Sequence, residues 1–129
     1  MRIKYYPAED IEKMALDIVQ TLNLKHIKLN QVKFVRSVGS SSLRTVARCH
    51  GLSKIWQKSL GINAHYIIEV ISERFDNQPE FEKIRVLIHE LMHIPFSFGG
   101  GFKHHDIVNS KNVDYLLKKY KEAKNENFN

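Results

Sequence analysis

The segment VLIHELMHIP, residues 86–95, limits most strongly how this chain can fold. Apolar residues recur every three or four positions from Phe81 to Leu91, which is the pattern of an amphipathic helix. At about 3.6 residues per turn, the apolar residues gather on one arc, and His89 and His93 lie almost opposite to it. The two histidines therefore occupy a helix face that does not build the core. The arc comprises Phe81, Ile84, Leu87, Ile88 and Leu91.

The sequence also indicates where this helix begins and ends. Pro79 suits a first-turn position, and Glu80 and Glu82 suit the positive end of the helix dipole. Pro95 must end the helix soon after His93, because proline lacks the N–H group that a helix interior requires. We expect a helix from about Pro79 to His93.

The spacing of the two histidines indicates a metal site. His89 and His93 are four residues apart, so on a helix they lie one above the other and can both bind one zinc ion. Glu90 lies between them in sequence and can act as general base toward a water at the metal. The alternative is a pair of histidines that binds no metal.

A catalytic zinc site usually has three protein ligands and one open position. After Pro95, the residues Gly99–Gly101 allow the chain to turn back and bring His104 and His105 toward the first two histidines. Either histidine can be the third ligand. Asp106 is a weaker candidate, because a carboxylate at this place also suits a helix N-cap.

Upstream of the motif, the chain alternates between helix and strand patterns. A helix is expected from Pro7 to about Leu22, and a second, short helix from Ser53 to Leu60, ended by Gly61. Residues 30–38 and 43–50 are expected to form a β-hairpin around the polar loop 39–42.

The remaining elements complete one domain over residues 1–129. Tyr66–Ile71 is an apolar strand candidate that leads toward the motif helix, and the last helix is expected from about Asp106 to Lys121, with a frayed tail at 122–129. The order of elements favours an α+β fold with a small three-stranded, mixed or antiparallel sheet.

Composition restricts the class of protein. The single cysteine, Cys49, excludes an intramolecular disulfide, and the N-terminus lacks the apolar segment of a secretory signal, so we expect a cytoplasmic protein. No apolar run approaches the ~20 residues that span a bilayer.

The net charge of +6 is unevenly distributed. No Asp or Glu occurs between Asp17 and Glu69, so residues 25–58 can form a basic face that contacts nucleic acid or an acidic partner. A solvated lysine-rich surface is the simpler interpretation. The basic residues of this region are Lys25, Lys28, Lys33, Arg36, Arg44, Arg48, Lys54 and Lys58.

The motif segment, followed by Phe98–Gly101 and a histidine, resembles the phage metallopeptidase domain family, whose members are small zincins with an HExxH motif. The resemblance extends over most of the chain. It includes Ala47-Arg48, Gly51-Leu52, Ile55-Trp56-Gln57, Tyr66–Val70 and Val108-Asn109.

The resemblance implies a minimal zincin-like domain that hydrolyses peptide bonds with zinc. The glycine-loop pattern of the family makes His105 the first choice for the third ligand. This chain departs from the pattern by having a second histidine, His104, where the family usually has another residue, so His104 is the alternative. The resemblance does not identify the residue that stabilises the oxyanion. His104 and Lys103 are both near enough in sequence for this role.

Analogy with zincins generally gives the strand Tyr66–Ile71 the role of an edge strand along which a peptide or protein substrate lies. Glu69 is then either a partner that orients a zinc-binding histidine or a surface carboxylate. The main alternative to an enzyme is a basic nucleic-acid- or protein-binding module with a structural or inert zinc site.

Overall fold

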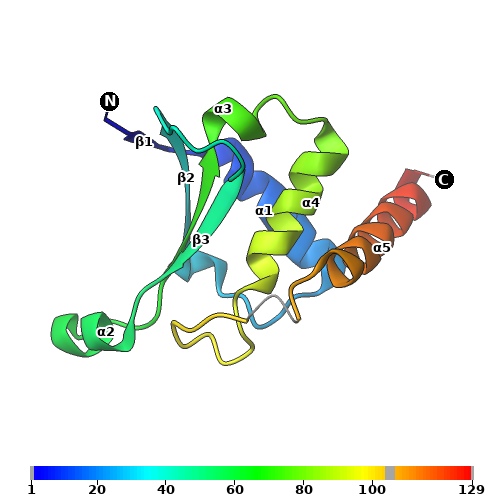
Figure 1. Ribbon diagram of the computed structural model, residues 1–129. Helices are drawn as coiled ribbons and strands as arrows, with labels where there is room; N and C mark the ends of the chain where they lie inside the picture. Colours follow the sequence, from blue (N-terminus) through cyan, green and yellow to red (C-terminus); the bar gives the residue numbers. More distant parts are fainter. Residues whose placement is uncertain (1, 104–106, 129) are drawn as a thin grey trace.

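The computed structural model describes residues 2–103 and 107–128, and it has an α+β architecture of two layers. One layer is a mixed sheet. The other contains α1 (Glu9–Leu22), α4 (Glu80–Met92) and α5 (Ser110–Phe128), which all lie on the same face of the sheet (Figure 1). No helix among the described residues is long and apolar enough to cross a membrane.

The described part of the chain forms four strands in the order β1-β2-β4-β3, one strand more than the sequence predicted. They are β1 (Lys4–Pro7), β2 (Val32–Val38), β3 (Ala47–Gly51) and β4 (Tyr66–Ile71). β1 was missed because its four residues, KYYP, are all exposed and show no alternation between buried and exposed positions. The predicted α+β class is confirmed.

The predicted hairpin between residues 30–38 and 43–50 is wrong. β2 and β3 do not pair with each other, because β4 lies between them, parallel to β2 and antiparallel to β3. β4 is the most apolar strand, and five of its six residues are buried. Placing β4 between two neighbours satisfies its backbone groups on both sides, which a buried strand requires.

β4 is therefore an internal strand, and its predicted role as an edge strand is also wrong. Within residues 2–103 and 107–128, the free edges of the sheet belong to β1 and β3. Since α4 packs against β3, the edge beside the motif helix is that of β3.

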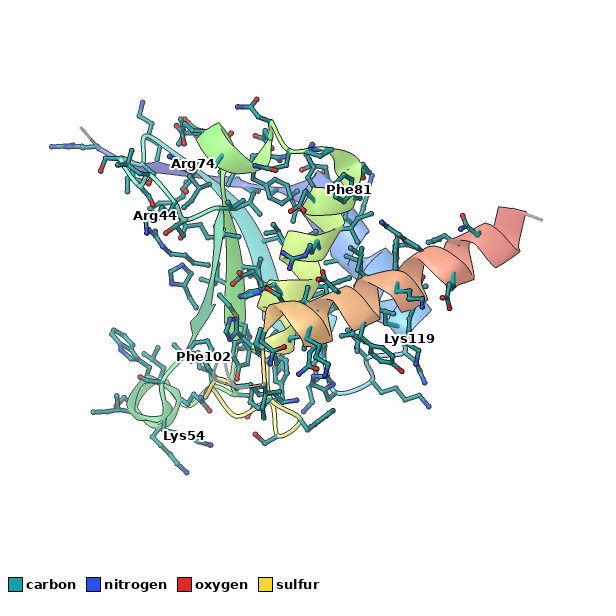
Figure 2. All side chains as sticks on the ribbon, turned by 45° about the vertical axis from the view of Figure 1, so that its right-hand side comes forward. Arg44, Lys54, Arg74, Phe81, Phe102 and Lys119 are labelled. Atoms are coloured by element: carbon teal, nitrogen blue, oxygen red, sulfur yellow. The ribbon has the colours of Figure 1, made fainter. Side chains whose placement is uncertain are left out.

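The core lies between the sheet and the three large helices. α4 contributes Leu87, Ile88 and Leu91, all fully buried, as the helical periodicity predicted. Phe81, assigned to the same arc, is 48% exposed, because it lies in the first turn of α4 at the far end from the cleft (Figure 2).

The shorter elements agree in part with the sequence. α2 (Lys54–Leu60) is confirmed and ends at Gly61, which adopts the left-handed conformation. α3 (Ser72–Phe75) is a single turn that was not predicted. α5 begins at Ser110 and extends to Phe128, so it starts and ends later than the predicted range from about Asp106 to Lys121.

Candidate active site

The histidine pair lies at the C-terminal end of α4. His89 is in the last turn of the helix, and His93 is its C-cap. The Nε2 atoms of the two side chains are 3.3 Å apart. The helix has therefore brought the two nitrogens together as the four-residue spacing predicted.

The orientation of the His93 ring is set by the loop that follows it. His93 Nδ1 donates a hydrogen bond to the carbonyl oxygen of Lys103 at 2.8 Å, and the Lys103 N–H donates to the carbonyl of His93 at 2.9 Å. A proton on Nδ1 leaves the Nε2 lone pair of a neutral ring available as an acceptor or metal ligand. Lys103 is thus held against the histidine pair by two hydrogen bonds.

The glycine loop holds this arrangement through contacts that only a glycine permits. Gly100 has a φ of 101°, and a Cβ atom there would lie 2.4 Å from the Leu52 carbonyl oxygen. The Tyr66 hydroxyl accepts a hydrogen bond from the Gly100 N–H and donates one to the Gly101 carbonyl. Gln57 donates to the Gly99 carbonyl. The loop that leads to Lys103 is therefore fixed to β4 and α2.

Glu90 is buried beside the histidines, with 7% of its surface exposed. Its carboxylate oxygen Oε2 lies 4.0 Å from His89 Nε2. Burial raises the pKa of Glu90 to about 7, because a carboxylate loses solvation in this environment. A carboxyl group with this pKa can accept and release a proton near neutral pH.

A cleft of about 440 Å³ opens over Glu90 and His93. Three consecutive residues of the edge strand β3 line it, together with two residues that follow the glycine loop. Its lining comprises Arg48, Cys49, His50, Glu90, His93, Phe102 and Lys103. Figure 2 shows Phe102 close to the end of the strands from which α2 projects.

Cys49 adds no nucleophile to the cleft. Burial, together with the negative charge of Glu90, raises the pKa of its thiol to about 12. The thiol is therefore protonated at neutral pH, whereas nucleophilic catalysis requires the thiolate.

Glu69 is nearly completely buried on β4 and accepts a hydrogen bond from His50 Nε2 at 2.8 Å, with an Arg48 nitrogen 3.8 Å away. The pKa of Glu69 is lowered: burial opposes ionisation, but the polar side chain of Ser37, the His50 hydrogen bond and the Arg48 charge together outweigh it. Glu69 thus orients a histidine, but the histidine is His50 and not a residue of the HExxH motif.

Of the histidines outside the motif, His50 lines the cleft. Nothing in the local pattern of residues 47–51 distinguishes it, since its place beside Glu90 depends on strand order. His26 contacts the Ile94 carbonyl, and His65 the Asn63 carbonyl.

Among residues 2–103 and 107–128, no group of three His, Cys, Asp or Glu side chains is placed to hold a metal ion. The candidate third ligands His104 and His105, and the alternative Asp106, lie outside the described residues. The described donors still fit one zinc ion. Two nitrogens bound tetrahedrally at ~2.0–2.1 Å are expected about 3.3 Å apart, which is the separation of the two Nε2 atoms.

The predicted basic face is partly neutralised in the fold. Arg36 binds Asp10 and Asp76, and Arg48 lies near Glu69, so these cations face carboxylates. The structure gives no support for a nucleic-acid surface there.

Comparison with known proteins identifies the class. Residues 3–123 match the family described as "Putative phage metallopeptidase", and the chain therefore belongs to this family. None of the curated proteins and none of the solved structures matched the chain.

Proposed function

We propose that the chain is a zinc-dependent metallopeptidase whose zinc ligands are His89, His93 and His105, with His104 as the alternative third ligand. The observation that carries the proposal is the convergence of His89 Nε2 and His93 Nε2 at 3.3 Å beside the buried carboxyl of Glu90. Family membership supports the same reaction class.

A zinc ion at this place would supply Lewis acidity, which polarises a scissile carbonyl and lowers the pKa of water toward about 7. The chain supplies the remaining requirements. The hydrogen bond from His93 Nδ1 to the Lys103 carbonyl fixes the ring so that Nε2 faces His89. This contact also selects the tautomer that a zinc ligand needs.

Glu90 is proposed as the general base. Its pKa of about 7 allows the carboxylate to take a proton from the attacking water and to return it to the leaving amine. The motif position and the 7% exposure both place its carboxyl inside the cleft, away from bulk water.

The substrate backbone is proposed to lie along the free edge of β3. The Ile71 N–H donates to the Val46 carbonyl, and the Leu52 N–H donates to the His65 carbonyl. In an antiparallel pair the hydrogen-bonded residues alternate, so the backbone groups of Arg48 and His50 face β4. Those of Ala47, Cys49 and Gly51 therefore face the free edge.

An extended peptide added at this edge can hydrogen-bond to the Cys49 backbone while it passes Glu90 and His93, which line the same cleft. This arrangement keeps the zincin-like substrate position but transfers it from β4 to β3. A cytoplasmic location remains part of the proposal.

Two substitutions in α4 test the assignment. Glu90→Gln should retain about one zinc per chain, whereas peptide cleavage should fall about 10²–10⁴-fold because the proton acceptor is lost. His93→Ala should lose the zinc. His65→Ala is the matched control, because the His65 ring hydrogen-bonds to the Asn63 carbonyl outside the cleft, and it should keep both zinc and activity.

Zinc content by mass spectrometry and cleavage of a peptide library are the measurements. Comparison of His104→Ala with His105→Ala identifies the third ligand. Purified protein without metal, unchanged by His93→Ala, would contradict the zinc site. Zinc retention without cleavage of any peptide would favour a structural site in a binding module or a hydrolase with another substrate.

A further inference from the structure

α2 presents apolar side chains to solvent. Ile55 is 73% exposed, Trp56 58% and Leu60 57%, and none of the seven residues of α2 is buried. We call these three residues the α2 apolar face. The helix projects from the lower end of the sheet, away from the helical layer (Figure 1).

The α2 apolar face does not pack on the body of the protein. Gln57, the least exposed residue of α2, is the one turned inward, where its Nε2 donates to the carbonyls of Leu52 and Gly99. At about 100° per residue, Ile55 and Trp56 lie on the side of the helix away from Gln57, and exposed Leu60 lies next to Trp56. A groove of about 360 Å³, lined by Ile55, Trp56 and Ser59, lies on this side of the helix.

α2 directly follows the strand that lines the candidate cleft. Gly51 ends β3, and only Leu52 and Ser53 separate it from the first residue of α2. A peptide extended along the free edge of β3 and continued past Gly51 therefore reaches α2 within a few residues, at ~3.3 Å per residue. Figure 2 shows Phe102 of the cleft and Lys54 of α2 in the same part of the molecule.

The charged residues beside the α2 apolar face indicate which kind of partner it can bind. Lys54 and Lys58 are exposed and border this face on the Ile55 side. No Asp or Glu occurs in the chain between Asp17 and Glu69, so α2 carries no acidic residue that would neutralise them. The surface is thus apolar with a cationic border, which complements an apolar segment flanked by carboxylates.

We propose that the α2 apolar face binds a segment of the protein substrate in which apolar side chains are followed by acidic residues, a few positions from the scissile bond. This rests on the proposed function, to which it adds a substrate class. The small area of the face suits one peptide segment. Single-stranded nucleic acid is a poorer match, because it stacks successive bases on several aromatics and α2 offers one.

Trp56 is the only tryptophan of the chain, so its fluorescence reports directly on this surface. The experiment uses the zinc-loaded full chain with Glu90→Gln, which binds without cleavage. The probes are synthetic peptides that carry Phe-Leu followed by Asp-Asp, or by Lys-Lys. The acidic peptide should shift the Trp56 emission to the blue and bind about tenfold more tightly than the basic one.

The combined substitution Ile55→Ser and Leu60→Ser keeps the reporter and should weaken this binding about tenfold or more. Tyr115→Ser is the matched control, because Tyr115 is 59% exposed on α5, and it should not change the affinity. Without the Glu90 substitution, the same Ile55/Leu60 variant should lose more cleavage of long apolar-acidic peptides than of short ones that fill only the cleft.

The outcomes separate the two proposals. A Trp56 shift with the acidic peptide, without cleavage by the wild-type chain, contradicts the peptidase and keeps the peptide surface. Cleavage without any Trp56 shift, and with unchanged selectivity in the Ile55/Leu60 variant, overturns the role of α2. A shift caused only by phosphatidylglycerol vesicles, by oligothymidylate or by a rise in protein concentration also overturns it.

Discussion

β2 and β3 are similar stretches of sequence with different places in the sheet. Both are short and contain small apolar and basic residues, and the sequence paired them as one hairpin. In the structure, β2 has a neighbour on each side and buries Val32, Phe34 and Ser37, whereas every residue of β3 is at least partly exposed. β3 instead has a free edge that lines the cleft over Glu90.

The difference indicates which strand can pair with an extended peptide substrate. A strand between two neighbours has its backbone groups hydrogen-bonded on both sides, whereas an edge strand keeps one set for another chain. β2 therefore contributes stability, whereas β3 offers the edge that we propose as the substrate-binding strand. Three predictions test this division.

The largest expected effect is on the free energy of unfolding. It compares Phe34 of β2 with Cys49 of β3, whose side chains both face the helical layer. Phe34→Ala in β2 should lower the free energy of unfolding by about 3–5 kcal/mol, because Phe34 is only 6% exposed and leaves a cavity. Cys49→Ala in β3 should cost about 1 kcal/mol or less. Urea denaturation of zinc-free protein measures both, and equal costs would contradict the division.

A smaller effect separates the two sides of β3 itself. Arg48→Pro removes an N–H that faces β4 and should lower the free energy of unfolding by about 2–3 kcal/mol. Cys49→Pro removes an N–H at the free edge and should cost clearly less, but it should raise the KM for peptides. Arg48→Ala serves as control for the lost side chain. If Cys49→Pro is the more destabilising of the two prolines, the inferred register is wrong.

The smallest effect concerns the arginines. Arg36 of β2 binds Asp10 at 2.6 Å and Asp76 at 2.9 Å, whereas Arg48 of β3 lies 3.8 Å from Glu69. These charges are partly exposed, so Arg36→Met should cost about 1 kcal/mol and Arg48→Met less. Denaturation at several pH values measures the difference.

The effect of Arg36→Met should depend on pH. The hydrogen bond and charge of Arg36 lower the pKa of Asp10, and they lower that of Asp76 against the opposing effect of burial. A lowered pKa adds stability above the ordinary value of 3.8, and this stability is lost as the pH falls below it. The wild type and the variant should therefore converge in strongly acidic solution. A difference that stays constant down to pH ~2 would show that the carboxylates are not involved.

The sequence was sufficient for the elements whose signals are local. The spacing of His89 and His93, the apolar arc of α4 and the stop at Pro95 all depend on residues within a few turns of each other. The helix α1 followed from the same kind of periodicity, α2 from its end at Gly61, and β4 from its apolar, β-branched residues. The order of these elements indicated the α+β class. Helical geometry places His89 above His93, and the loop contact of the His93 ring then allows the 3.3 Å separation of the two Nε2 atoms.

The tertiary structure alone decided the strand order, and with it the cleft. Insertion of β4 between β2 and β3 placed His50 and Cys49 beside Glu90, although about 40 residues separate them along the chain. Strand pairing joins residues distant in sequence, so no local pattern specifies which strand keeps a free edge. The sequence by itself therefore determined the placement of His89, Glu90 and His93 on α4, and only the fold determined which edge strand lies beside them.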